Sequence, residues 1–251
     1  ADVATAIDER FRPSLFARSI NQHKPRALTR SVMSNPHSSN ATNTPPAAHM
    51  SAQLVVVLLS LLLGIQPITT DLYLPALPAL TLDLSGSMMQ AQLTLTALSL
   101  AFGVSQLFWG PLSDRFGRRP ILVWGMSFFT LASVGSTLAP TIELLIVWRV
   151  IQGAAMGAAV SSARAIVRDL YGPVEGARAM SKGLTGLGVL ACFSGPTGAA
   201  TSYFFGWRAS MACIVIFGLV TTVVLFMRFI ETNPHKNPRA LQPRVLAGNW
   251  T

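Results

Sequence analysis

Charged residues are scarce in this sequence, at 12% of 251 residues, whereas a soluble globular domain carries about a quarter. Hydrophobic residues make up 51%, and long stretches contain almost no charge, which excludes an ordinary soluble domain. The net charge of +9 does not indicate a nucleic-acid partner, because the basic residues cluster at the ends of apolar stretches. They do not form a continuous basic face with base-reading aromatic side chains. We expect these clusters to face anionic lipid head groups.

Cysteine and histidine are also few. Cys192 and Cys213 both lie in apolar stretches and are typical of small packing residues, and the four histidines lie outside those stretches. No grouping of thiols, imidazoles or carboxylates has the spacing of a metal site or of a nucleophilic site. We therefore expect no metal, no cofactor and no enzymatic activity, and we regard an integral membrane enzyme as the weaker interpretation.

What the sequence has is a series of apolar segments, each close to the roughly 20 residues that cross a hydrocarbon core about 30 Å thick. Six such segments predict an all-α membrane protein with six transmembrane helices. The predicted spans are Leu54–Leu74, Ala91–Trp109, Ile121–Ala139, Ile142–Val160, Leu184–Phe204 and Ala209–Met227.

Positive charge alternates between the connections of these spans. Of the 19 Lys and Arg residues, all but Arg149, within a span, and Arg208 lie in the second and fourth connections or at the two chain ends. Cationic connections stay on the cytoplasmic side of a membrane, so both termini are predicted to be cytoplasmic. Aromatic rings that favour the head-group level should then mark the outer interface, where we place Tyr73, Trp148, Tyr203 and Trp207.

The segments outside the spans differ in composition. Residues 1–50 are rich in Asn, Ser, Pro and Thr, and such a segment cannot bury enough apolar surface to fold, so we predict disorder there. Residues 51–231 form the predicted six-helix domain. Residues 232–251 are polar and contain proline, which is typical of a connecting loop.

Asp71 is the first residue that suggests a mechanism, because it is an acidic residue near the outer part of an apolar helix. A carboxylate there costs free energy unless it is paired, hydrated or protonated. Burial favours the protonated form, which suits a proton carrier. An interfacial aspartate that ends the helix before Pro75 is an equally good interpretation.

Arg149 is the second charge within a span, at a depth comparable to that of Asp71. The two side chains are expected to approach each other or to share a water-filled cavity, and Gln152, one turn deeper, favours the cavity. The alternative is that Arg149 extends to the outer surface. Gly153 and Gly157 form a small-residue face suited to close helix contact.

The connection between the second and third spans has the most specific motif, Gly110-Pro-Leu-Ser-Asp114-Arg115-Phe-Gly117-Arg118-Arg119-Pro120. Gly110 is expected to permit close helix approach, Gly117 a positive φ angle, and Pro120 the first turn of the next helix. A charged turn that merely follows the distribution of positive charge explains the arginines. It does not explain the spacing of the glycines and Asp114.

This motif resembles the loop between the second and third helices of the major facilitator superfamily. Arg149-x-x-Gln152-Gly153 resembles the fourth-helix motif of that superfamily's drug–proton antiporters. The strings Asp71-Leu-Tyr-Leu-Pro-Ala-Leu-Pro and Arg164-Ala-Ile-Val-Arg168-Asp169 are similar to those of the bicyclomycin-resistance-like (Bcr/CflA) drug efflux branch.

The resemblance implies roles for these residues. Asp71 would belong to the proton or substrate site, and Arg149 would tune its protonation, with Gln152 nearby. Asp114 and the arginines of the loop, Arg115, Arg118 and Arg119, would act as a conformational switch between two halves of a transporter. Gly195, Pro196 and Gly198 resemble the fifth-helix antiporter motif, in which a kink and close packing limit leakage.

Members of this superfamily carry twelve spans in two six-helix halves, each built as a 3+3 repeat. The sequence therefore resembles an N-terminal half. The implied partners are small-molecule drugs, protons, membrane lipid and a C-terminal half, and the implied location is the bacterial cytoplasmic membrane. Two alternatives stay open, namely a metabolite or sugar transporter on the same scaffold and a truncated, nonfunctional fragment.

Overall fold

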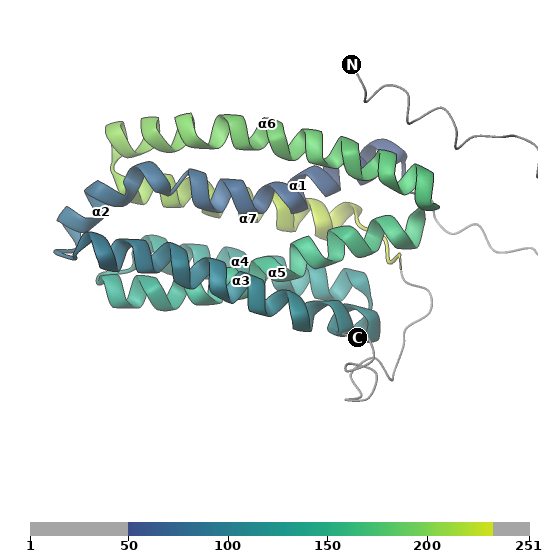
Figure 1. Cartoon of the computed structure of the whole chain (residues 1–251), viewed down its shortest axis with the longest axis horizontal. Coiled ribbons are helices and arrows are strands. Elements are labelled where there is room, and N and C mark those ends of the chain that lie inside the picture. The colour runs from purple at the N-terminus through teal and green to yellow at the C-terminus, as the bar shows by residue number, and fades with distance from the viewer. Residues whose placement is uncertain (1–49, 233–251) are drawn as a thin grey trace, which may run out of the picture. The chain divides into compact units, whose positions relative to one another are not determined.

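The computed structural model describes residues 50–232 of the chain. Except for Met50 and Thr232, the segments predicted to be disordered (1–50) and to form a connecting loop (232–251) lie outside the described residues. The described part is helical throughout, in six long helices and two short ones (Figure 1). The long helices are α1 (Ala52–Asp71), α3 (Met88–Phe116), α4 (Arg118–Leu138), α5 (Ile142–Leu170), α6 (Pro173–Phe205) and α7 (Trp207–Arg228).

Each predicted span overlaps one long helix, and α3, α5 and α6 continue well beyond the predicted spans at their basic ends. Within the described residues, five helical segments are long and apolar enough to cross a membrane. The sixth helix, α6, is not among them, because glycine, serine and threonine residues lower the mean hydropathy of its outer part.

Two of the connections between helices consist of a single glycine with a positive φ angle. Gly117 has φ 104° and separates α3 from α4, and Gly206 has φ 83° and separates α6 from α7. Residues other than glycine rarely adopt such φ angles, because their Cβ atom clashes with the backbone, so glycine is needed at both turns. The positive φ predicted for Gly117 is confirmed, and Pro120 lies in the first turn of α4 as expected.

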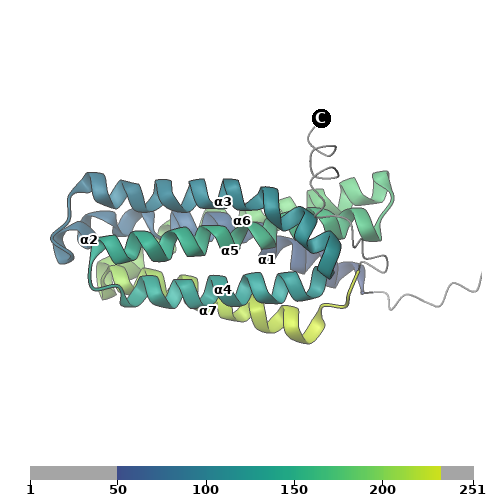
Figure 2. The ribbon, with the colours of Figure 1, turned by 90° about the horizontal axis from the view of Figure 1, so that it is seen from below.

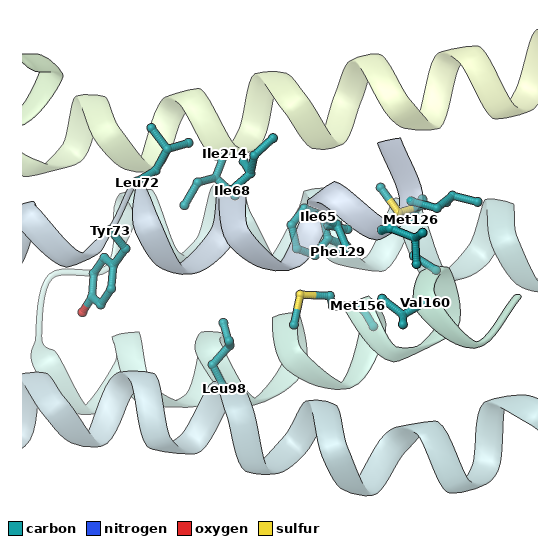
Figure 3. Close-up of a cluster of buried hydrophobic side chains, with 14 of the residues drawn as sticks. Ile65, Ile68, Leu72, Tyr73, Leu98, Met126, Phe129, Met156, Val160 and Ile214 are labelled. Carbon is teal, nitrogen blue, oxygen red and sulfur yellow. The ribbon is translucent and has the colours of Figure 1, made fainter. Parts of the chain in front are cut away.

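The helices fall into two sets of three, and the main contacts join a helix of one set to a helix of the other. Helix α3 packs against α5 as α6 packs against α1, and α4 contacts both α5 and α7 (Figures 1 and 2). The first set is α1, α3 and α4, and the second is α5, α6 and α7, so the predicted six-helix, 3+3 arrangement is confirmed. The core between the sets consists of apolar side chains such as Ile65, Phe129, Met156 and Ile214 (Figure 3).

Close helix contact depends on small residues because lipid tails are as apolar as the side chains that pack together. A Cβ atom on Gly153 of α5 would overlap the backbone carbonyl of Leu98 in α3, and one on Gly157 would overlap the hydroxyl of Ser105. The small-residue face predicted for α5 is therefore confirmed. Gly110 has no neighbouring atom within 4 Å that such a Cβ would meet, so the close approach predicted there is wrong within the described residues.

The first membrane segment is discontinuous. Helix α1 ends at Asp71, the short helix η1 (Leu74–Ala76) follows, and α2 (Leu77–Asp83) completes the segment. Pro75 and Pro78 are the second residues of these short helices, within the first turn, where a missing N–H group is tolerated. Asp71 thus ends a helix, as one interpretation predicted, but the chain continues in helical turns for a further twelve residues, so Asp71 does not lie at the end of the bundle.

Candidate functional site

The carboxylate of Asp71 faces α6 from the break in the first membrane segment. Its Oδ2 accepts a hydrogen bond from the Ser194 hydroxyl at 3.2 Å, and its Oδ1 accepts one from Thr70 at 3.0 Å. Asp71 is half-buried, whereas Ser194 is buried. Two hydroxyl donors therefore offset part of the cost of a carboxylate at this depth.

The glycine–proline motif of α6 lies beside this break. A Cβ on Gly198 would overlap the backbone of Leu72, the residue after Asp71, so the two helices touch there through their main chains. Pro196 lies inside α6, and Gly195 has open space around its Cβ position. The structure thus brings Leu72, the residue after Asp71, against Gly198, although the two are far apart in the sequence.

Arg149 is fully buried in the middle of the bundle. Its guanidinium carbon lies 3.8 Å from the centroid of the Tyr73 ring, its Nη1 donates to the Gln152 side-chain oxygen at 3.1 Å, and its Nη2 donates to the Met211 sulfur at 3.3 Å. The alternative in which Arg149 extends to the outer surface is therefore wrong. Its Nε has no hydrogen-bond partner. Asp71 and Arg149 do not form an ion pair, so the direct approach expected for them is not seen.

Two further hydrogen bonds extend this buried cluster to neighbouring helices. The Gln152 amide donates to the Ser133 hydroxyl of α4 at 2.7 Å, and the Tyr73 hydroxyl shares a hydrogen bond of 2.6 Å with Thr94 of α3. The sequence predicted Tyr73 to lie at the outer interface, which is wrong, because the side chain has no exposed surface. Tyr73, Thr94 and Ser133 were not identified as site residues. The only sequence signal for Tyr73 was its position two residues after Asp71.

The motif between α3 and α4 forms a second cluster, at the basic end of the bundle. Arg118 is only 5% exposed, and its guanidinium binds the carboxylates of Asp114 at 2.7 Å and Asp169 at 2.9 Å. It also donates to the Ser113 hydroxyl at 2.6 Å. Asp114 lies in α3, and Asp169 is the next-to-last residue of α5. Arg118, which belongs to α4, therefore connects the three helices at this end of the bundle.

The other arginines of the motif are exposed. Arg115 stacks near the Phe116 ring at 5.3 Å, and Arg119 donates to the backbone carbonyl of Phe226 at 3.1 Å. Glu231, which the sequence did not single out, accepts the backbone N–H groups of Arg118 and Arg119 at 2.8 and 3.1 Å. The chain after α7 is thereby bound to the start of α4.

The opposite end of the bundle carries a smaller polar contact. The Asp83 carboxylate accepts hydrogen bonds from the indole N–H of Trp207 at 2.9 Å and from Arg208 at 2.5 Å. No group of three or more metal-ligating side chains occurs among residues 50–232. The two cysteines are unpaired, and Cys192 is exposed, contrary to the packing role expected for it.

A bundle of membrane-spanning helices with two sets of three, a charged turn at one end and ionisable side chains in its interior defines the class of membrane transporters. Residues 59–250 match the family model of the Major Facilitator Superfamily. The chain belongs to this superfamily, and it is a multi-pass membrane protein of a transporter family, not an enzyme.

Several curated proteins are similar to this chain. A bicyclomycin resistance protein homolog of Haemophilus influenzae is 30% identical over 201 residues, which cover 80% of this chain and 50% of that protein. Multidrug resistance protein D of Escherichia coli is 31% identical over 185 residues, 74% of this chain and 47% of that protein. A chloramphenicol resistance protein of Pseudomonas aeruginosa is 34% identical over 160 residues, 63% of this chain and 38% of that protein. The chain thus spans about half the length of these relatives or less.

Solved structures share the fold at lower sequence identity. The human organic anion transporter MFSD10 (TETRAN) aligns with a TM-score of 0.62 and 20% identity, over 79% of this chain and 53% of that chain. The proton:xylose symporter XylE aligns with a TM-score of 0.60 and 16% identity, over 79% of this chain and 51% of that chain. The resemblance of the sequence to an N-terminal half of the bicyclomycin-resistance-like branch agrees with these findings.

Proposed function

We propose that this chain is the N-terminal half of a drug exporter that is driven by proton antiport across the bacterial cytoplasmic membrane. The observation that carries the proposal is the position of Asp71, at a break in the first membrane segment and hydrogen-bonded to Ser194 in the antiporter-like region of α6. The names of the relatives, which are resistance proteins for bicyclomycin, chloramphenicol and several drugs, support an exported drug as substrate.

Asp71 is the proposed carrier of the coupling proton. It lies within the bundle, and its hydrogen bonds come from hydroxyl groups, which bind either form of a carboxyl group. External protons would load Asp71, and their release to the cytoplasm would be exchanged for outward movement of drug. Arg149 and Gln152 form the proposed tuning group, because they are buried and hydrogen-bonded to each other at the level of Tyr73.

The cluster around Arg118 is the proposed conformational switch. Gly110, Asp114, Arg115, Gly117 and Arg119 belong to the same motif, which covers the end of α3, the turn at Gly117 and the start of α4. Arg118 binds carboxylates from two helices, so a movement of α5 relative to α3 would change these ion pairs. A second six-helix half is the partner that this switch would engage.

The proposed substrates are amphipathic small molecules that are uncharged or cationic. Such molecules suit a mostly apolar site with few polar anchors. The test reconstitutes the chain into liposomes together with the C-terminal half of Multidrug resistance protein D and measures proton flux on addition of drug. Asp71→Asn is expected to abolish this flux. Asp83→Asn, which removes an acid at the end of the same segment, serves as the matched control and is expected to retain it.

Undiminished flux in the Asp71→Asn variant would contradict the proposal. Absence of drug-driven flux in the unmodified pair would favour the nonfunctional-fragment alternative. A panel of drugs and sugars in an efflux-deficient host would distinguish drug export from metabolite transport on the same scaffold.

The proposed orientation places both ends of the chain in the cytoplasm. In a variant without the two natural cysteines, we expect Ser51→Cys to react with a membrane-impermeant maleimide only after the cells are permeabilised. Leu82 is at the other end of the first segment, and its side chain is 83% exposed. We expect Leu82→Cys to react in intact cells. The reverse pattern would contradict the orientation.

A further inference from the structure

The charge of Arg149 has no carboxylate partner among residues 50–232. Its contacts are an aromatic ring, an amide oxygen and a thioether sulfur, and its Nε is unpaired. A fully buried cation is costly unless an anion or several strong acceptors compensate it. A carboxylate close to Arg149 would therefore bind its guanidinium more strongly than these present contacts do.

Tyr73 is the residue that holds this cation. Its ring lies under the guanidinium of Arg149 from α5, and its hydroxyl is fixed by Thr94 from α3. The side chain has no exposed surface, so both contacts are shielded from solvent. Tyr73 also lies in the break of the first membrane segment, two residues after Asp71, which connects the aromatic partner of Arg149 to the coupling carboxylate through the same short piece of chain.

We propose that Tyr73 is the resting partner of Arg149 and competes with Asp71 for its guanidinium. The inference rests on the proposed function only in taking Asp71 as the proton carrier. A cation–π contact becomes stronger when it is desolvated, but a charged carboxylate in a medium of low dielectric attracts a guanidinium more strongly. Arg149 therefore stays on the Tyr73 ring while Asp71 is protonated and moves toward Asp71 when its proton leaves.

The surroundings of Asp71 offer few other charges that could do this. Helix α1 packs against α5, α6 and α7. Helix α6 has no charged side chain between Lys182 and its end at Phe205, and contributes the Ser194 hydroxyl. At the outer end of α7, Arg208 is bound to Asp83. Arg149 is thus the cation that α5 places nearest to the break, and Tyr73 is the titratable side chain that covers it.

The experiment measures the protonation of Asp71 directly in the whole chain, purified in detergent micelles. A hydrophobic carbodiimide modifies protonated carboxyl groups, and mass spectrometry of the resulting peptides gives the labelled fraction of Asp71 at each pH. Asp83, in the same chain but at the end of the bundle, serves as an internal reference. The readout requires no transport and no second half.

Two variants of Tyr73 distinguish the contribution of its ring from that of its hydroxyl group. Tyr73→Leu removes the aromatic partner, so Arg149 becomes available to the charged form of Asp71. We expect the labelling midpoint of Asp71 to fall by about one pH unit, a tenfold change in proton affinity. Tyr73→Phe keeps the ring and is expected to keep the midpoint of the wild-type chain. Tyr203→Phe, at an exposed tyrosine, is the matched control.

A double-mutant cycle shows whether the effect passes through the cation. In an Arg149→Gln background, Tyr73→Leu is expected to leave the Asp71 midpoint unchanged. A shift of equal size in both backgrounds, or no shift from Tyr73→Leu in the wild-type background, would overturn the proposal. An equal shift from Tyr73→Phe would also overturn it, because the ring would then not be the active part.

The outcome can be told apart from failure of the proposed function. If Asp71→Asn retains drug-driven proton flux but the labelling midpoint responds to Tyr73→Leu only when Arg149 is present, the competition is real and the transport assignment is wrong. If the flux is lost but the midpoint does not respond, antiport stands and Tyr73 has only a packing role. Thermal unfolding of each variant in the same detergent identifies any that fail to fold, for which Tyr73→Met, a flexible apolar side chain without a ring, replaces the leucine variant.

Discussion

The side chain of Glu231 caps the first turn of α4. Its Oε1 accepts a hydrogen bond of 2.8 Å from the backbone N–H of Arg118, although the two residues are 113 positions apart in the sequence. The first N–H groups of a helix have no partner within the helix, and a carboxylate there also interacts favourably with the helix dipole. The N-cap residue of α4 is Gly117, whose side chain cannot fill this role. A residue beyond α7 therefore supplies the cap that the local sequence lacks.

We expect Glu231→Ala to lower the free energy of unfolding by about 1 kcal/mol, the usual cost of a lost helix cap. Glu231→Gln keeps an acceptor without the charge and should cost less. Unfolding in mixed detergent micelles, followed by helix content, measures both. Glu175→Ala, in the first turn of α6, removes an exposed acid from a comparable position and is the control. Equal losses from Glu231 and Glu175 would show that the hydrogen bonds of Glu231 to α4 add nothing to the helix-dipole interaction that both acids make.

Arg118 should be far more important for stability than its neighbour Arg115. Arg118 is buried and binds two carboxylates and a hydroxyl group, so Arg118→Ala leaves Asp114 and Asp169 without their cation. Both acids are partly exposed, at 44% and 21%, which lets water compensate in part. We expect a loss of about 2 kcal/mol. Arg115→Ala, in the same turn but exposed, should cost less than about 0.5 kcal/mol, and similar values for the two would contradict this difference.

The general fold could be predicted from the sequence because its signals are local and repeated. Each span needs only a run of apolar residues, and the turn at Gly117 needs only a residue that tolerates a positive φ angle. The predicted ends of the spans in α5 and α6 are less accurate, because both helices continue beyond their apolar part into a basic segment. Among the described residues, α6, with its glycines and hydroxyl residues, is the long helix without a segment apolar enough to count as a membrane span by composition.

The contacts of the site could be predicted less well, because they join helices that are distant in sequence. Asp71 and Arg149 stand out in the sequence as unusual charges within apolar spans, but nothing in the sequence indicates that the Tyr73 ring packs against the Arg149 guanidinium. An aromatic residue near a span end usually lies at the interface. Here the break after Asp71 turns Tyr73 into the bundle, and a helix break of this kind changes direction in a way that residue periodicity does not show.

Gly153 and Gly110 provide a test of which glycines are needed for packing. A Cβ at position 153 would meet the backbone oxygen of Leu98, which cannot move aside without displacing α3. We expect Gly153→Ala to lower the free energy of unfolding by about 1–3 kcal/mol, the range for overpacking. Gly110→Ala should cause no loss in the 251-residue chain, because its Cβ would enter open space. A loss from Gly110→Ala as large as that from Gly153→Ala would contradict the packing of α3 on α5.

Gln152 connects the buried cation to α4, since it accepts from Arg149 at 3.1 Å and donates to Ser133 at 2.7 Å. Gln152→Leu removes both hydrogen bonds and leaves the guanidinium with one fewer acceptor in a buried site. Loss of a hydrogen bond to a charged group costs about 1.5–3 kcal/mol, and we expect Gln152→Leu to lower the free energy of unfolding by about that amount. Ser133→Ala removes only the contact with α4 and should cost about 1 kcal/mol. Chemical unfolding of the two variants and of the double variant gives the coupling between these residues. If the double variant loses no more than Gln152→Leu alone, Ser133 acts only through Gln152, whereas strictly additive losses would show that the two side chains stabilise the bundle independently.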